Sequence, residues 1–356
     1  MKNVHLIVCD LFLPEGVTAE VCADLRLPAL ESMLARSASA GPVLAGGGAS
    51  LEKLLCSVFG VPCRPDAPIA PVSAAFDGLG EGCWLRGDPV HLRLQRDQLI
   101  LLPEVEVSTD EARQLCAALN EHFAGQGMEF FAPHPLRWYV RVDRLPDIET
   151  VPLSLAAGRN VRDLLPGGRE AARWHRIFNE IQMLLFNHPV NEVREARGTL
   201  PVNSLWLWGG GCDTLLAKPA SRGLNVLPQK NYDQVSSDEA LAGMFAAAAG
   251  VAFAEWSGQW RDEGSSGRQL LVWTGLRSAL RRGDLDAWRN ALQEFETGHA
   301  QPLWRALRAG KVARLQVDVL GGERAQRLTL TRADAWAFWR RARPLAQHPM
   351  GNPEKP

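Results

Sequence analysis

The chain has 356 residues, of which 46% are hydrophobic and 22% are charged, and its formal net charge at pH 7 is −1. These values are ordinary for a globular protein with a well-buried core, and the length suggests about two domains. A net charge this close to zero gives no broad attraction to nucleic acid or to an anionic membrane surface, so we expect neither as a partner.

Seven cysteines are scattered along the chain without a CxxC pair. A disulfide framework or a zinc knuckle would need closer, paired spacing. We therefore expect reduced, mostly buried thiols and a cytoplasmic location. The first apolar segment, His5–Asp10, lacks the basic region and cleavage site of a signal peptide, and no apolar run approaches the ~20 residues of a membrane span.

The N-terminal part has the pattern of an α/β domain. Val4–Val8 reads as a buried parallel strand, and Asp10 follows it. The apolar spacing then predicts a helix over Pro28–Arg36. A glycine-rich turn at 46–50 opens another helix at 51–59. This strand, helix, loop and helix order is typical of the start of an α/β fold.

From about Trp84 the pattern changes to that of a compact α+β unit. Strands are expected at 91–94, 98–102, 128–131 and 136–142. Ser108 and Glu111 form a capping box before a helix. The helix Arg169–Asn187 is expected to close this unit, which spans about a hundred residues.

After His188 the α/β pattern resumes. Strands are predicted at 204–208, 270–274 and 314–320, together with a helix capped by Asp284 and a last helix at 336–341. We therefore expect an α/β fold with a discontinuous parallel-sheet core and an inserted smaller α+β domain. The core spans 1–84 and 200–345, the insert with its closing helix spans 85–199, and 346–356 is a disordered tail.

The segment His188–Gly211 has the spacing HPVN-x2-R-x3-G-x2-P-x-N-x2-W-x-W-G. It resembles the cofactor-independent phosphoglycerate mutases of the short archaeal and bacterial type, in the alkaline phosphatase superfamily. The resemblance covers nearly the whole chain, and it includes Asp10, Pro28–Ala35, the loop 48–50 with F-G-V-P at 59–62, and Arg277–Glu296. The chain also resembles the RpfE-type regulatory proteins of proteobacteria, which look like a degenerate branch of the superfamily. The implied fold is an alkaline-phosphatase-like domain with an inserted smaller one.

The resemblance implies two divalent metals and an activated serine, and the chain keeps few of the residues they need. Asp10 stands at a metal-ligand position, but Arg277 and Arg281 replace an Asp and a His of the family. A guanidinium cannot bind a metal, and its charge repels one. Asp318 follows the family pattern near the late strand, yet no histidine comes after it. The family has a second metal-binding aspartate near its N-terminus. In this chain only Glu15 could take its place, and only with a shift of the loop. We expect no metal site and no cofactor.

Ser50 and Asp10 each have two interpretations. Ser50 lies one residue from the position of the family's nucleophile, but it also suits the N-cap of the helix at 51–59. A serine without metals lacks activation, which favours the cap. Asp10 is either a lone metal ligand or the partner of Arg277 or Arg281. Burial of an unpaired carboxylate is costly, so we favour the ion pair.

The arginines at family positions predict anion binding. The resemblance implies that Arg86, Arg137 and Arg194 hold the carboxylate and phosphate of a substrate, with Asn191 and Asn203 nearby, and a planar fork suits both groups. A site that binds an anion without turning it over would look like this. In the alternative, which remains open, Arg194 and Asn203 instead stabilise a domain junction, HPVN is a helix-ending turn and His188 is a structural residue.

Three hypotheses follow. The favoured one is a pseudoenzyme without catalytic residues, which acts as a regulatory or binding protein for an anionic small molecule or a protein partner. The second is an active phosphoglycerate mutase or phosphatase that uses Mn or Zn with Asp10 and Ser50. It requires additional ligands to converge, namely Asp284, Asp318 and Glu323. The third is an interaction protein that exposes Trp336 and Trp339, although we expect these side chains in the core. The sequence names neither ligand, partner nor oligomeric state.

Overall fold

The structure, a computed structural model, describes residues 1–13, 17, 20–22, 24–42, 49–63, 65–212, 228–262, 264, 266–321 and 324–348. The chain divides into two compact units. Unit 1 comprises Met1–Leu55 and Lys230–Pro356, and unit 2 comprises Cys56–Gln229. Across the described segments, none of the helices combines the length and apolarity that a membrane span requires.

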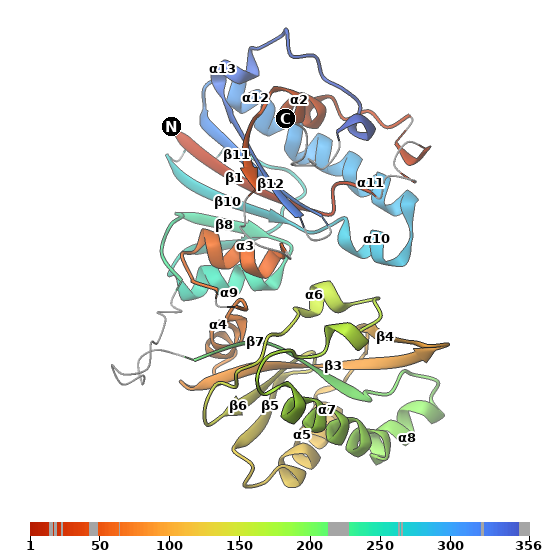
Figure 1. The fold of residues 1–356 in the computed structure, drawn as a ribbon. Coiled ribbons are helices and arrows are strands. Elements are labelled where there is room, and N and C mark those ends of the chain that lie inside the picture. Colours follow the sequence, from red (N-terminus) through yellow and green to blue (C-terminus); the bar gives the residue numbers. More distant parts are fainter. Residues whose placement is uncertain are drawn as a thin grey trace. The chain divides into compact units, whose positions relative to one another are not determined.

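Unit 1 is built on a seven-stranded sheet with the order β2-β12-β11-β1-β10-β8-β9 (Figure 1). Its strands are β1 (Lys2–Cys9), β2 (Ala38–Pro42), β8 (Gln234–Ser237), β9 (Ala252–Glu255), β10 (Gly267–Trp273), β11 (Val312–Gly321) and β12 (Arg324–Thr331). The five strands from β11 to β9 are parallel, and β12 and β2 are antiparallel additions at one edge. The strands expected at the start and near the end of the chain are therefore neighbours.

Helices pack against this sheet. The helices of unit 1 are α2 (Pro28–Arg36), α9 (Ala240–Ala248), α10 (Arg277–Arg282), α11 (Leu285–Phe295), α12 (Gln301–Arg308) and α13 (Arg332–Ala335), with a π-turn η3 (Glu296–Ala300) and a 3-10 turn η4 (Leu345–Gln347). The helix α3 (Leu51–Val58) begins in unit 1, and its last three residues belong to unit 2. Alternate residues of β1, Val4, Leu6 and Val8, share one apolar core with α2, α11 and α12, which lie together in Figure 1. Asp284 caps α11 as expected, by accepting the amide of Ala287 at 2.9 Å.

The end of unit 1 differs from the prediction. The helix expected at 336–341 does not form, because a capping box at Thr331 starts the short α13 earlier. Ala335 and Ala337 then take the inward positions, so the large aromatic residues between and after them face outward. The exposed side chains are Trp336 at 53%, Phe338 at 79% and Trp339 at 68%. Their expected burial was wrong. Of the predicted disordered tail, 346–347 lie in η4, and 349–356 are outside the described residues.

Unit 2 is an antiparallel sheet with helices against it. Its strands are β3 (Cys83–Gln95), β4 (Gln98–Leu102), β5 (Met128–His134), β6 (Arg137–Val142) and β7 (Ser204–Cys212). Its helices are α4 (Ile69–Phe76), α5 (Thr109–His122), α6 (Leu153–Ala156), α7 (Ala171–Phe186) and α8 (Pro189–Ala196), with a 3-10 turn η1 (Arg162–Leu164). The hairpin of β3 and β4 and the capping box of Ser108 and Glu111 before α5 are confirmed.

The boundaries of unit 2 lie outside those expected for the insert, mainly because of β7. This strand was expected in the parallel core, but it pairs antiparallel with β3, placing Leu207 opposite Gly87. Both Leu205 and Trp206 are buried, so the strand is covered on both faces. A continuous apolar run of this kind is typical of parallel strands, and periodicity alone could not assign it to the other sheet.

A disulfide joins β3 to β7. Cys83 and Cys212 stand opposite each other in the register, with Cα atoms 4.0 Å apart. The expectation that no disulfide forms was wrong for this pair, because 129 residues separate the two cysteines in sequence. The other five cysteines are thiols. Cys9, Cys22, Cys56 and Cys116 are buried, as expected, and Cys63 is partly exposed.

Candidate functional site

Asp10 and Arg277 meet at the carboxyl edge of the sheet in unit 1. Asp10 follows β1 with a positive φ of 61°, and Arg277 begins α10 shortly after β10. Because β1 and β10 are adjacent and parallel, their ends bring the two residues together. The Nε of Arg277 donates to Oδ2 of Asp10 at 3.1 Å. The ion pair predicted for Asp10 is confirmed, with Arg277 as the partner.

The guanidinium of Arg277 lies among several acidic side chains. Burial opposes its charge, but Cys9, Asp10 and Glu52 nearby outweigh that effect and raise the pKa of Arg277. Glu239 also acts on it, and burial raises the pKa of the Glu239 carboxyl. One cation thus balances a cluster of carboxylates at this edge. We did not anticipate the contribution of Glu239, which also caps α9.

These residues do not fit the pair of metals that the family resemblance implies. Arg277 supplies the positive charge that a metal would bring. Asp318 is fully buried within β11 and bonded to His5 and Arg327, so its oxygens are occupied. Asp284 is committed to its cap, and Glu15 and Glu323 lie outside the described residues. Among the described residues, no group of three or more His, Cys, Asp or Glu side chains is placed to hold a metal ion.

Ser50 is the N-cap of α3. Its Oγ accepts the amide of Lys53 at 3.2 Å, and its carbonyl accepts the amide of Leu54 at 3.0 Å. The residue is only 1% exposed. The cap interpretation is therefore confirmed. The glycines at 46–48 that precede it in the family-like loop lie outside the described residues.

In unit 2, Arg86 and Arg137 lie on the neighbouring strands β3 and β6. Arg137 donates to both oxygens of Asp77, at 2.9 and 2.6 Å, and the Tyr139 hydroxyl donates to the same carboxylate. Burial would raise the pKa of Asp77, but these bonds outweigh it and hold that pKa below its usual value. The charge of Arg86 acts on Asp77 in the same direction.

Arg86 has partners of its own. It donates to Oδ1 of Asp88, and its guanidinium lies 5.3 Å from the ring centroids of both Tyr139 and Trp208. Trp208 donates to the other oxygen of Asp88 at 2.7 Å. The partner Asp88 could have been found in the sequence, because residues two apart on a strand share a face. Asp77 gave no such signal, since 60 residues separate it from Arg137.

The three remaining predicted ligand residues bind the chain itself. Asn191 donates to the carbonyls of Leu185 and Val202. Arg194 donates to the carbonyl of Leu200 and forms an ion pair with Glu111 at 3.0 Å. These hydrogen bonds and this ion pair all lie within unit 2.

Asn203 and His188 are also held by the backbone. Asn203 bonds both the amide and the carbonyl of Leu92. His188 accepts the amide of Val190 and so caps α8. Pro189 therefore begins a further helix, where its fixed φ is favourable, and does not mark a final stop.

A solved structure shares the fold of this chain. The structure of the PH0037 protein from Pyrococcus horikoshii is 13% identical and has a TM-score of 0.54, covering 92% of this chain and 87% of that chain. The likeness shows the fold, and the parallel sheet of unit 1 agrees with it. The protein has a mixed α/β fold built on a parallel sheet, and the predicted fold class is confirmed.

Sequence comparison gives weak homology to cofactor-independent phosphoglycerate mutases. The 2,3-bisphosphoglycerate-independent phosphoglycerate mutase of Methanosarcina barkeri is 30% identical over 107 residues, which are 30% of this chain and 27% of the relative. The protein of the same name from Methanosarcina acetivorans is 26% identical over 224 residues, or 59% of this chain and 55% of the relative. The matches thus span about a quarter to a half of the relatives' length. No family model matches the chain.

Proposed function

We propose that this protein is a phosphoglycerate-mutase-like pseudoenzyme that acts as a regulatory or binding protein in the cytoplasm. The ion pair of Arg277 with Asp10 carries the proposal. It lies at the sheet edge where the family resemblance places metal ligands. A guanidinium has no lone pair to offer a metal, and its charge repels one. An RpfE-type, degenerate branch is the placement we propose, on sequence likeness alone.

The ligand we propose is a phosphorylated or carboxylate small molecule. Of the five arginine and asparagine positions, Arg137 is the best placed, because its side chain is 22% exposed and Arg86 lies close behind it. An anion there must compete with Asp77 for the guanidinium, so we expect weak binding. Asn191, Arg194 and Asn203 support the backbone around this unit and need not touch the ligand.

The decisive experiment is metal retention. The purified protein is incubated with Mn and Zn, dialysed, and analysed for bound metal, then assayed for mutase and phosphatase activity. We expect no retained ion and no activity. Two tightly held ions per chain, with activity that Ser50→Ala removes, would instead support the alternative of an active enzyme with a rearranged site. A variant that restores the family's residue types, Arg277→Asp with Arg281→His, is expected to retain more metal than the natural chain.

A second function is favoured by the exposed aromatic side chains of unit 1. Trp336 and Phe338 line a groove of about 590 Å³ together with the arginines of α2 and α12. Arg308 lies over the Trp336 ring at 4.4 Å. Among the residues that the structure describes, no acidic side chain lines this groove. Tryptophan and arginine dominate the energetics of protein interfaces, so we propose that an acidic protein segment docks here.

A synthetic peptide that alternates glutamate and leucine tests this docking surface. We expect the natural chain to bind it, with an affinity that falls as salt is added. The double variant Trp336→Ala with Phe338→Ala should bind at least ten times more weakly. Met183→Ala, which removes an exposed apolar side chain of unit 2, is the matched control. Equal affinity of the double variant and the natural chain would exclude the groove as the docking surface.

A further inference from the structure

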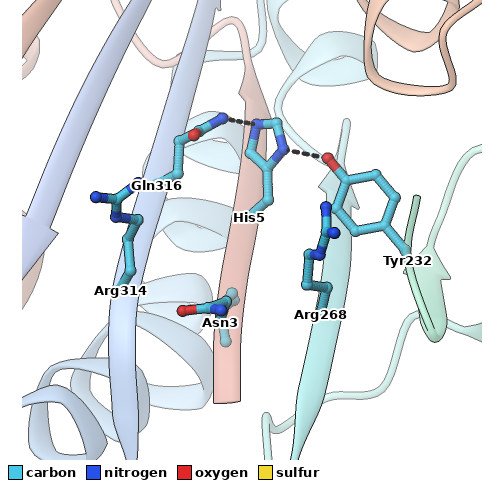
Figure 2. Close-up of a pocket in the computed structure, with 7 residues that line it drawn as sticks. Asn3, His5, Tyr232, Arg268, Arg314 and Gln316 are labelled. Carbon is cyan, nitrogen blue, oxygen red and sulfur yellow. Dashed lines mark hydrogen bonds between the residues drawn. The ribbon is translucent and has the colours of Figure 1, made fainter. Parts of the chain in front are cut away.

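A polar pocket of about 370 Å³ opens on one face of the sheet in unit 1. Figure 2 shows its lining, which comes from β1, β10, β11 and the segment before β8. Residues alternate between the two faces of a strand, so Asn3 and His5 face away from the apolar core that Val4 and Leu6 join. Parallel sheets are normally covered on both faces. Exposed polar side chains on the central strands are therefore unusual.

Two arginines flank Asn3 at the same level of the sheet. Asn3 is the register partner of Arg268 on β10 and of Arg314 on β11. With strands ~4.8 Å apart, the two arginine Cα atoms are separated by roughly 10 Å. Both side chains are exposed, and neither guanidinium has a hydrogen-bond or ion-pair partner within the described part of the chain.

The floor of the pocket is fixed by a buried hydrogen-bond chain. The Tyr232 hydroxyl and Nδ1 of His5 are hydrogen-bonded at 2.7 Å, as Figure 2 shows. The Nε2 of His5 lies 2.8 Å from Oδ2 of Asp318 and 2.9 Å from the Gln316 amide. Burial raises the pKa of Tyr232 to about 12, so this hydroxyl keeps its proton at neutral pH.

Asp318 lies on the same face of β11 as Gln316, and its charge is balanced there. Arg327 donates to both of its oxygens, at 2.7 and 2.6 Å. Burial would raise the pKa of Asp318, but the bonds from Arg327 and His5 outweigh it and keep the carboxyl ionised. Because Arg327 and His5 already bind the Asp318 carboxylate, this carboxylate does not neutralise Arg268 or Arg314. Within the described part of the chain no acidic side chain lines the pocket, and its lining carries the charges of Arg268 and Arg314.

We propose that this pocket binds a small dianion, with Arg268 and Arg314 on either side and the Asn3 amide between them. Two fixed cations match a phosphate group or a dicarboxylate, because the planar guanidinium presents two parallel donors to either group. The volume is at the lower end of that of ligand sites, which suits a small molecule. This site is independent of the loss of catalysis and of Arg86 and Arg137 in unit 2.

Titration calorimetry of the full chain at low ionic strength tests the site, with inorganic phosphate, succinate and acetate as probes. We expect phosphate or succinate to bind at least ten times more tightly than the monoanion acetate. Whichever of the two dianions binds more tightly identifies the ligand chemistry. Arg268→Gln and Arg314→Gln should each weaken that binding about tenfold, which corresponds to about 1.4 kcal/mol.

Two control variants locate the binding. Arg261→Gln removes another exposed arginine of unit 1 and should leave the affinity unchanged. Arg137→Gln removes the anion site proposed in unit 2, and the dianion binding that remains in this variant should be lost when Arg268→Gln is added. Loss of binding only in Arg137→Gln, equal affinity of the natural chain and the double variant Arg268→Gln with Arg314→Gln, or no dianion binding at all would each overturn the proposal.

Discussion

At the scale of the residue, the sign of one side chain decides the chemistry of the sheet edge. Asp10 follows the first strand as a metal-binding residue of the resembling family would, but Arg277 faces it. The two side chains are 22% and 17% exposed, so each is partly desolvated and depends on the other. The pair balances charge at this edge of the sheet, and Glu52 and Glu239 lie close enough to act on Arg277 as well.

Removal of this cation should destabilise the fold. We expect Arg277→Gln to lower the free energy of unfolding by about 2 kcal/mol, because it leaves partly buried carboxylates without a counter-charge. Urea denaturation followed by circular dichroism measures the effect. Arg282→Gln changes an exposed arginine of the same helix and should alter the stability by less than about 0.5 kcal/mol. Equal free energies of unfolding for the two variants would mean that the ion pair of Asp10 and Arg277 does not stabilise the fold.

Thiol reactivity is a second prediction at this scale. Burial is the main cause that raises the pKa of Cys9 and of Cys116 to about 12, so neither is a thiolate at pH 8. We expect Cys63, the one partly exposed free cysteine in the described part of the chain, to react first with iodoacetamide in the native protein. Peptide mass spectrometry after short labelling gives the order. Early labelling of Cys9 would contradict its burial.

At the scale of the element, an aromatic stack connects η3 to β10. His299 stacks on Trp256, with centroids 4.1 Å apart, and Phe295 stacks on Trp273 at 4.2 Å. The π-turn η3 places His299 inside the unit, where it is 3% exposed. Burial lowers the pKa of this imidazole to about 4. Protonation of the His299 ring therefore destabilises the packing of η3 against Trp256.

The stack should make stability depend on pH. Unfolded His299 takes up a proton near pH 6.5, whereas the folded ring does so only near pH 4. The contribution of neutral His299 to the free energy of unfolding is thus complete above pH 6.5. It is lost as the pH falls towards 4, by at most about 1.4 kcal/mol per pH unit. Other histidines with lowered pKa values share this range, so the difference between the natural chain and His299→Phe is the relevant measurement. Parallel stability curves from pH 7 to 4.5 would contradict the prediction.

At the scale of the whole molecule, two units with different sheets are formed from interleaved parts of the chain. Unit 1 takes both ends, and unit 2 takes the middle. The disulfide of Cys83 and Cys212 lies within unit 2 and closes a separation of 129 residues. A covalent bond across so long a segment restricts the unfolded chain strongly, by about 4–5 kcal/mol in the chain-entropy account.

The bond predicts how the units respond to reduction. In denaturant without reductant, five thiols should react, and seven should react after reduction, because the chain has seven cysteines and two are paired. The double variant Cys83→Ser with Cys212→Ser should unfold unit 2 at lower denaturant and leave unit 1 unchanged. Trp174 is buried in unit 2 and Trp288 is buried in unit 1. Replacement of one or the other tryptophan shows which unit each fluorescence transition reports. Seven reactive thiols before reduction would contradict the bond.

The sequence by itself determined the elements whose signals are local. The capping box at Ser108, the caps at Ser50 and Asp284, and the apolar first strand all follow from residues within one turn or one strand. The ion pair of Asp10 was also predicted, because the family spacing placed a cation at the end of the neighbouring strand. The caps and the first strand depend on residues that are close in sequence. The ion pair was inferred from the order of elements that this chain shares with the family it resembles.

Only the tertiary structure decided which strands pair and which side chains remain in contact with water. β7 joined unit 2 because its backbone hydrogen bonds with β3, which no local pattern encodes. The same long-range pairing brought Cys212 to Cys83, and the register of β1 placed Arg268 and Arg314 on either side of Asn3. The exposure of Trp339 also followed from packing around it, since the same side chain would suit a core. Pairing and burial depend on the free energy of the whole fold, and distant residues contribute to it as much as near ones.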